Sequence, residues 1–279
     1  MAVHLPLSIE GLGTGSEPIF FGAVNVYLQE KSALFRPTPR WVDRIFDAPA
    51  LLRWAAEKSA STTARGLEEM TLSMGARPAF KGYQGSGPYP FPGSLCTSIN
   101  EEVVHGIPSA KRKLKEGDIL SVDFGTVVDG LYGDAALTVA VGKISEVAKH
   151  LMQVTKTALE LAIGEVVREG MRISDIGAVI QDHVEAEGLS VVRDFVGHGI
   201  GRSLHEEPQI PHYRSSGHNE RIRDGMVLAI EPMVNVGTWE VESAADGWTQ
   251  LTKDRKLSAH FEHSVAVCKD GPLVLSQVA

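Results

Sequence analysis

Residues 121–137, SVDFGTVVDGLYGDAAL, form a pattern that favours a two-stranded hairpin. The pair Asp129-Gly130 divides two β-like runs and is typical of the tight turns that join antiparallel strands. If this pair forms the turn, Asp123 lies opposite Ala136. Asp134 then points to the same face as Asp123, because side chains alternate along a strand. The hairpin therefore predicts two carboxylates that are diagonal neighbours.

Two such aspartates can share a cation, or each can be solvated at the surface. Two buried carboxylates without a counterion repel each other, and one of them would then hold a proton. For Asp123 and Asp134 taken alone, the solvated arrangement is the simpler interpretation.

A second segment, FVGHGIGRSLHEEP, carries His198 and His205 among three glycines. The glycines allow the backbone to pass close to another group. A neutral imidazole is a frequent ligand of transition metals and a frequent hydrogen-bond donor. The alternative is a turn in which His198 only makes a hydrogen bond, and the segment alone does not exclude it.

Two glutamates occur in otherwise apolar, strand-like runs. Glu231 lies in MVLAIEPMVN and Glu262 in SAHFEHSVAVC. An unpaired buried glutamate is unfavourable, so each residue either has a partner or faces solvent on a half-exposed strand. Pro232 indicates a strand end or an edge, because it cannot donate to the sheet. His260, Glu262 and Ser264 share one face of the second run.

Together these segments supply four carboxylates and one imidazole without a thiolate. Such a set suits a pair of hard or borderline divalent ions better than structural zinc. Four negative charges against two dications leave the site close to neutral, so that a hydroxide could be held between the ions. Two ions about 3.5–4 Å apart can acidify a bridging water and stabilise a tetrahedral intermediate. The combination predicts metal-assisted hydrolysis.

Composition narrows the class of protein further. The 279 residues include 27 Lys and Arg against 35 Asp and Glu, a net charge of −8 that argues against nucleic-acid recognition. No apolar run approaches the length of a membrane span, and the start MAVHLPLSIEGLG does not resemble a secretory signal. Two cysteines are far from a disulfide framework. We therefore expect a cytoplasmic globular protein without a membrane association.

The order of expected elements indicates an α+β domain of two similar halves, each with helices followed by strands. Ser145 is placed to cap one helix, and Ser174 to cap another that ends at Gly188. The expected helices cover residues 41–60, 63–74, 145–163 and 174–187. A loop is expected at 82–93, and strands are expected at 94–100, 118–125, 130–141, 191–196, 226–234, 248–252 and 258–268.

Over residues 75–268 the chain resembles the type I methionine aminopeptidases. The resemblance rests on the order and spacing of GARPAFKGY, SLCTSINEEVVHGIPS, LKEGDILSVDFG, DGLYGDAA, FVGHGIGRSLHEEPQIPHY, DGMVLAIEPMVN and DGWTQLTKDRKLSAHFEH. It implies the α+β pita-bread fold, with two pseudo-symmetric halves around a curved antiparallel sheet. It also implies a single metallopeptidase catalytic domain over residues 41–279, preceded by an extension of unassigned structure over residues 1–40.

The same resemblance implies a ligand set for two divalent ions, of cobalt, manganese, iron or zinc. Asp123 would chelate one ion, and His198 and Glu231 would chelate the other. Asp134 and Glu262 would bridge both ions.

The activity implied is removal of the initiator methionine from nascent polypeptides whose second residue is small. A hydroxide bridging the ions would attack the first peptide bond, and Glu231 would carry a proton to the leaving amine. His205 would donate to the scissile carbonyl oxygen, and His105 would contact the substrate near its first amide. The enzyme would act as a monomer on N-termini near the ribosome.

A narrow apolar pocket is also implied for the methionine side chain. Its lining residues would be Tyr83, Cys96, Trp248, Phe91 and Leu204. Cys96 is then a small, soft part of the wall beside a thioether rather than a nucleophile.

Four features depart from the family pattern. The loop over residues 85–93 is longer than usual, the segment over residues 54–74 is shorter, His260 replaces the usual glutamine, and Ala135 replaces a hydroxyl residue.

Two alternatives remain open at this point. One is a peptidase of the same fold that cleaves before proline, and the other is a non-catalytic binding protein on that fold. Xaa-Pro peptidases usually have an additional N-terminal domain, which this chain is too short to contain.

Overall fold

The computed structural model describes residues 60–73, 75–85, 87–217 and 219–276. The extension expected over residues 1–40 and nearly all of the helix expected over 41–60 lie outside them. The helices are α2 (Ala60–Ser73), α3 (Glu146–Val166) and α4 (Ile173–Ala186). The strands are β1 (Arg77–Pro78), β2 (Cys96–Ile99), β3 (Ile119–Asp123), β4 (Thr126–Val128), β5 (Leu131–Gly133), β6 (Ala135–Ala140), β7 (Ser190–Val191), β8 (Gly197–Gly199), β9 (Glu206–Ile210), β10 (Val227–Ile230), β11 (Met233–Asn235), β12 (Val241–Ser243), β13 (Gln250–Thr252), β14 (Ser258–His260), β15 (Glu262–Cys268) and β16 (Gly271–Val274).

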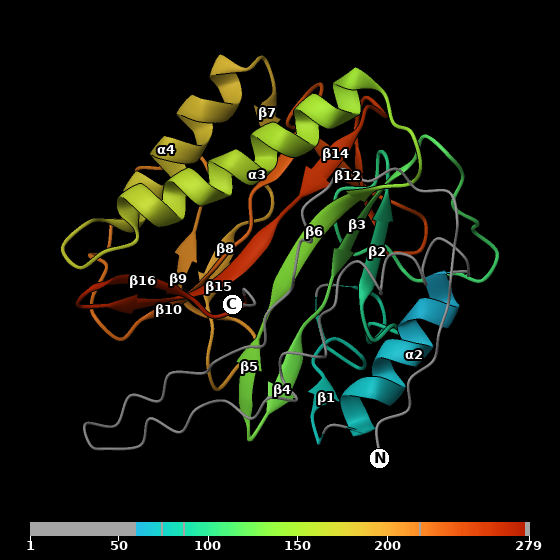
Figure 1. Ribbon diagram of the computed structural model, residues 1–279, viewed down its shortest axis with the longest axis horizontal. Helices are drawn as coiled ribbons and strands as arrows, with labels where there is room; N and C mark the ends of the chain where they lie inside the picture. The colour runs from blue at the N-terminus through green and yellow to red at the C-terminus, as the bar shows by residue number, and fades with distance from the viewer. Residues whose placement is uncertain (1–59, 74, 86, 218, 277–279) are drawn as a thin grey trace.

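A large antiparallel sheet forms the centre of the molecule, with the strand order β2-β3-β6-β15-β10-β8-β9 and β16 paired to β15. The pairing of β6 with β15 joins the N-terminal strands to the C-terminal ones. Smaller sheets β1-β4-β5, β14-β11-β7 and β12-β13 flank it (Figure 1). In the described residues no helix is long and apolar enough to cross a bilayer.

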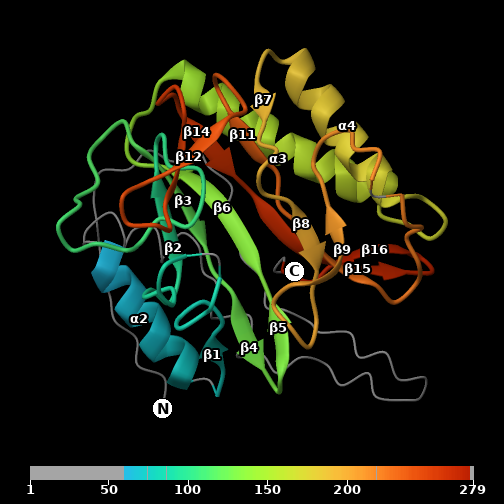
Figure 2. The ribbon, with the colours of Figure 1, turned by 180° about the vertical axis from the view of Figure 1, so that it is seen from behind.

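Helices α3 and α4 pack together against one side of the C-terminal strands, as the two opposite views show (Figures 1 and 2). Their apolar stripes bury Leu151 of α3 and Ile180 of α4 in the largest hydrophobic cluster. Strand β15 contributes Val265 and Val267 to that cluster. Because side chains alternate along a strand, Glu262 and Ser264 lie on the opposite face, away from the helices.

The N-terminal strands follow the same rule with a different helix. Leu120 and Val122 of β3 pack with Leu67 of α2 in a second apolar cluster. Ser121 and Asp123 therefore point to the other face of the sheet. The two halves thus turn their polar positions toward one shared surface.

The register predicted for the hairpin is confirmed. Val128 pairs with Leu131, and Asp123 pairs with Ala136. Both turn residues have positive φ, +52° at Asp129 and +81° at Gly130, as a type I′ turn requires. The second arm is interrupted at Asp134, where β5 ends and β6 begins.

With Ser145 and Ser174 counted as caps, three of the six predicted ends of the described helices agree to within one residue, whereas α2 begins three residues before the predicted start and α3 ends three residues after the predicted end. Helix α2 ends one residue before the predicted boundary at Met74, and the Ser145 side chain accepts from the Ala148 N–H at the start of α3. Gly188 has a φ of +74° directly after the end of α4.

The predicted cap of α4 was wrong. The helix begins at Ile173, after Arg172, whose backbone N–H donates to the Asp175 side chain. Ser174 is thus already inside the helix, and its hydroxyl bonds to Asn219 instead.

The long strands predicted from the sequence are broken into shorter ones. Only residues 190 and 191 of the region around 191–196 form a strand, and the stretch predicted from Trp248 begins as a strand at Gln250. The run over 226–234 is divided at Glu231 and Pro232, and the run over 258–268 is divided at Phe261. Glu231 is therefore not in a strand interior, because Pro232 has no N–H with which to continue the ladder. At Glu231 and Pro232 the chain leaves the large sheet for the small sheet β14-β11-β7, and at Phe261 it returns from that small sheet to the large one.

Candidate functional site

A row of paired residues crosses the large sheet and carries the first carboxylates. Cys96 pairs with Asp123, Asp123 with Ala136, and Ala136 with Glu262. Directly opposed residues in antiparallel strands face the same side. The small side chain of Ala136 therefore lies between the two acids, whose Cα atoms are about 10 Å apart at the usual strand spacing.

Asp134 is brought to the same surface by the break in the hairpin. The Ser264 hydroxyl, on β15, accepts from the Asp134 N–H at 3.0 Å and donates to the Asp134 carbonyl at 2.8 Å. These two bonds take the place of the strand pairing that ends there. The charge of Asp123 raises the pKa of Asp134, as expected for two carboxyl groups that are near neighbours.

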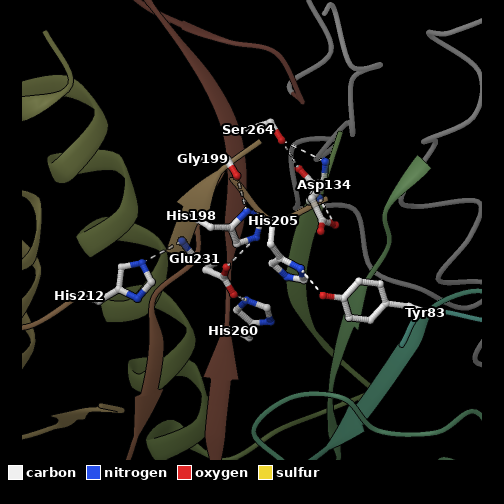
Figure 3. A network of polar contacts seen from close by, with 10 residues as sticks. Tyr83, Asp134, His198, Gly199, His205, His212, Glu231, His260 and Ser264 are labelled. Carbon is white, nitrogen blue, oxygen red and sulfur yellow. Dashed lines mark hydrogen bonds and ion pairs between the residues drawn. The ribbon is translucent and has the colours of Figure 1, made fainter. Parts of the chain in front are cut away.

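His198 and Glu231 approach the acids from the C-terminal half. His198 of β8 pairs with Ala229 of β10, and Glu231 follows the end of β10. The backbone N–H of Glu231 donates to His212 Nε2 at 3.2 Å, which holds the chain at this break (Figure 3). Ligand atoms of Asp134, His198 and Glu262 lie within 4.8 Å of one another.

His198 presents the lone pair of its Nε2 to the site, because its Nδ1 is used in a hydrogen bond to the backbone. Its Nδ1 lies 2.9 Å from the Gly199 carbonyl, which can only accept, so Nδ1 carries the proton. Its Nε2 is then an acceptor and lies 3.4 Å from Glu231 Oε1. Two electron-pair donors at this distance suit a cation bound between them.

Two carboxylate oxygens give a second indication that the site fits divalent cations. Within the described residues, Asp123 Oδ1 and Glu262 Oε1 are buried without any hydrogen-bond partner. Buried polar atoms in native proteins nearly always have partners, so these oxygens require one. Carboxylate oxygens and a neutral imidazole are ligands that manganese, iron, cobalt and zinc accept.

Burial also perturbs the titration of the acids. It raises the pKa of Asp123 to about 7 and the pKa values of Asp134, Glu231 and Glu262 well above their usual range. The neighbouring carboxylates raise the last three further by repulsion. Such a cluster favours the binding of positive charge.

His105 and His205 face the same surface from two loops. His105 has a φ of +61°, and its ring lies edge-on to Phe195 and Trp248, at 5.4 and 6.3 Å between centroids. Burial lowers the pKa of His105 to about 4, so its imidazole is neutral. The rings of His205 and His198 are 4.4 Å apart, and burial lowers the pKa of His205 as well.

Tyr83 has a contact that its sequence motif did not indicate. Its hydroxyl lies 2.7 Å from His205 Nδ1 (Figure 3), while burial raises the pKa of the phenol. A protonated phenol can donate to Nδ1, which leaves Nε2–H of His205 free. The side chain predicted only to line a pocket therefore also orients a histidine.

The five predicted pocket residues meet in one apolar cluster beside the acids. Phe91, Cys96, Leu204 and Trp248 are buried in it, and Tyr83 packs against it. The loop over residues 82–93 folds onto the indole of Trp248, whose Nε1–H donates to the Tyr89 carbonyl at 2.9 Å. Burial raises the pKa of the Cys96 thiol well above its usual value, so the thiol stays protonated.

Two further histidines belong to the site, and only one of them, His212, had no distinct signal in the sequence. His212 lies in the motif IPHY and acts on Glu231 only through a backbone bond, which no spacing reveals. His260 was singled out as unusual, and the structure places its Nε2 3.8 Å from Glu231 Oε2. Burial lowers the pKa of His260 to about 3.

Comparison with known proteins agrees with this geometry. Residues 44–269 match metallopeptidase family M24. Methionine aminopeptidase A of Synechocystis is 54% identical over 209 residues, which are 75% of this chain and 80% of that protein. Methionine aminopeptidase 1 of Bacillus subtilis is 49% identical over 211 residues, which are 76% and 82% of the two chains.

Solved structures extend the comparison to the fold. A methionine aminopeptidase from Thermotoga maritima superposes with a TM-score of 0.76 at 44% identity, over 82% of this chain and 92% of that one. The prolidase from Pyrococcus horikoshii has a TM-score of 0.62 at 18% identity, over 85% and 60%, and shares the fold alone. These neighbours agree with the α+β pita-bread fold expected from the sequence.

Proposed function

The chain belongs to metallopeptidase family M24, and we propose that it removes the initiator methionine from nascent polypeptides with a small second residue. One observation carries this proposal. Ligand atoms of Asp134, His198 and Glu262 lie within 4.8 Å of one another, close to the apolar cluster that contains Cys96 and Trp248, so that an apolar side chain and its peptide bond could be held together. Two relatives that are 54% and 49% identical to this chain, over 75% and 76% of its length, are methionine aminopeptidases.

Two divalent ions are the cofactor in this proposal. Asp123 would hold one ion, His198 and Glu231 would hold the other, and Asp134 and Glu262 would be shared. The unpartnered oxygens of Asp123 and Glu262 and the free Nε2 of His198 support this set. Bound there, divalent ions supply acidification of water and polarisation of a carbonyl group.

The protein side chains move and hold protons in this scheme. Glu231 would accept a proton from water and pass it to the leaving amine, because its carboxylate borders the place where the ions would be held. His205 donates Nε2–H to the oxygen of the scissile carbonyl as negative charge develops, while Tyr83 holds its Nδ1. His105 contacts the substrate near its first amide, from a loop position beside Trp248.

The methionine side chain would occupy the cluster of Tyr83, Phe91, Cys96, Leu204 and Trp248. A thioether is compatible with aromatic rings and with a protonated thiol, which are the groups found there. Phe91 lies edge-on to Trp248 with 5.2 Å between the centroids, which supports its place in the pocket despite the long loop that carries it.

The remaining assignments complete the proposal. Residues 41–279 would form a single catalytic domain, with residues 1–40 as an extension. The protein would act as a monomer in the cytoplasm, on N-termini that emerge from the ribosome.

The proposal is tested by incubating the metal-free protein with Met-Ala-Ser and with X-Pro peptides while manganese, iron, cobalt or zinc is added separately. We expect release of free methionine from Met-Ala-Ser with at least one ion, and no release of X from X-Pro peptides. Cleavage of X-Pro peptides alone would support the proline-specific alternative. No cleavage of any peptide, together with no bound metal, would support a non-catalytic binding protein.

A further inference from the structure

His260 is a buried histidine to which the proposed reaction gives no role. It is the last residue of β14, and only 1% of its surface is exposed. In the described part of the chain, its Nε2 has no hydrogen-bond partner. Burial of an unpartnered ring nitrogen is unfavourable, so the position calls for an interaction that compensates it.

The backbone of His260 is held firmly by hydrogen bonds and by strand pairing. Its N–H donates to Thr138 Oγ1 at 2.8 Å, and Thr138 Oγ1 donates back to its carbonyl at 2.9 Å. Thr138 is itself bonded to Ser121 at 2.8 Å, and His260 pairs with Met233 across β14 and β11. These contacts fix the backbone from which the ring extends, and the burial of the side chain leaves the ring little room to turn.

Glu231 lies between two imidazoles, and each of its oxygens faces one of them (Figure 3). Oε1 is 3.4 Å from His198 Nε2, which carries no proton. Oε2 is 3.8 Å from His260 Nε2. The two oxygens of Glu231 thus have different surroundings. Oε1 faces the lone pair of His198 Nε2, and Oε2 faces His260 Nε2, which has no hydrogen-bond partner in the described residues.

We infer that His260 is a positioning residue that donates Nε2–H to Glu231 Oε2 and so holds Oε1 ready, beside His198, for a divalent ion. For this hydrogen bond the distance must close from 3.8 Å to about 2.9 Å by rotation of the Glu231 carboxylate. A hydrogen bond to an ionised carboxylate is among the stronger ones in proteins. The inference rests on the proposed role of Glu231 as a ligand.

Binding of Mn²⁺ to the full-length, metal-free protein tests the inference by calorimetry, without reference to catalysis. His260→Leu should weaken one of the two binding steps by about 10- to 100-fold, the usual effect of losing a group that orients a ligand. His260→Gln places an amide N–H at a similar reach and should stay within about threefold of the wild type. His183→Leu is the matched control, because His183 Nε2 is also buried without a partner but lies on α4.

A double-mutant cycle with Glu231→Gln shows whether His260 acts through Glu231. We expect His260→Leu to cause no additional loss of affinity in the Glu231→Gln background. Losses that multiply instead would overturn the inference. Unchanged affinity in His260→Leu would overturn it too, as would equal losses in His260→Leu and His260→Gln when both melt near the wild type.

Two further measurements separate a failure of this inference from a failure to fold and from a failure of the proposed function. If His260→Leu does not fold, His260→Asn is compared with His260→Gln, since the shorter amide should not reach Glu231. Affinity in His260→Asn equal to that of His260→Gln would count against the inference. Hydrolysis of Met-Ala-Ser is measured separately, so that an inactive wild type would refute the proposed function while the Mn²⁺ comparison still stands.

Discussion

Removal of the Ser264 hydroxyl should destabilise the protein and weaken its metal site together. Ser264 is fully buried, and its Oγ both accepts from the Asp134 N–H and donates to the Asp134 carbonyl. Ser264→Ala therefore deletes two hydrogen bonds across the joint between the two halves of the sheet. It leaves Asp134, one of the proposed bridging ligands, without its main-chain anchor.

The loss of unfolding free energy in Ser264→Ala follows from the hydrogen-bonding groups of Asp134 that lose their partner. Loss of a neutral hydrogen bond costs about 1 kcal/mol, and a buried N–H without a partner costs about 1–3 kcal/mol. We expect the free energy of unfolding of the metal-free protein to fall by about 2–4 kcal/mol. At about 2 °C per kcal/mol for a domain of this size, the melting temperature should fall by about 4–8 °C. Mn²⁺ affinity should fall by about 10- to 100-fold.

Urea denaturation of the metal-free protein and calorimetric Mn²⁺ titration measure the two effects. Ser243→Ala is the control, because the Ser243 hydroxyl bonds to Gln250 at an exposed position and its loss should cost less than about 0.5 kcal/mol. If Ser264→Ala unfolds within 1 kcal/mol of the wild type and binds Mn²⁺ equally well, the bonds to Asp134 do not hold the site.

Three further predictions concern the site. Glu262→Ala should abolish release of methionine while its circular dichroism spectrum and melting temperature stay near those of the metal-free wild type; normal turnover would exclude Glu262 as a ligand. His205→Ala should lower kcat more than it changes KM, and Tyr83→Phe should lower kcat by a smaller factor; an unchanged kcat in His205→Ala removes the histidine from the mechanism. The pKa of His105 is about 4 in the folded protein and about 6.5 in the unfolded protein. Between pH 6.5 and pH 4 the unfolded state therefore binds more protons than the folded state. The free energy of unfolding should fall as the pH is lowered through this range. Asn tolerates the positive φ at this position. In urea denaturation between pH 6.5 and 4.5, His105→Asn should reduce the dependence of stability on pH by about 1 kcal/mol per pH unit, and an unchanged dependence would contradict the assignment.

Local signals were sufficient for the hairpin and for three of the six helix ends. An Asp-Gly turn determines which residues face each other, so the pairing of Asp123 with Ala136 could be predicted. Helix α4 shows where such signals fail. Ser174 has the chemistry of a cap, but an interaction of Arg172 with Asp175 starts the helix earlier. The choice between neighbouring starts depends on small energy differences that the composition of a segment does not reveal.

The strand breaks at Asp134, Glu231 and Phe261 were harder to foresee, since each depends on a switch from one sheet to another. Of these three breaks, only the one at Glu231 had a local sequence signal, which is the following Pro232. The hydrogen bond from Tyr83 to His205 joins residues 122 positions apart, and no pattern in either segment indicates it.

By itself, the sequence determined the kinds of groups available, their order, and which face of each strand they occupy, because these follow from covalent connectivity and the two-residue repeat of a strand. The tertiary structure decided which of them meet. Pairing of β6 with β15 brings Asp134 to Ser264 across 130 residues, and the break after β10 turns Glu231 between His198 and His260. Such contacts depend on how sheets and helices pack as a whole, and therefore on burial energies summed over the entire core rather than on any local preference.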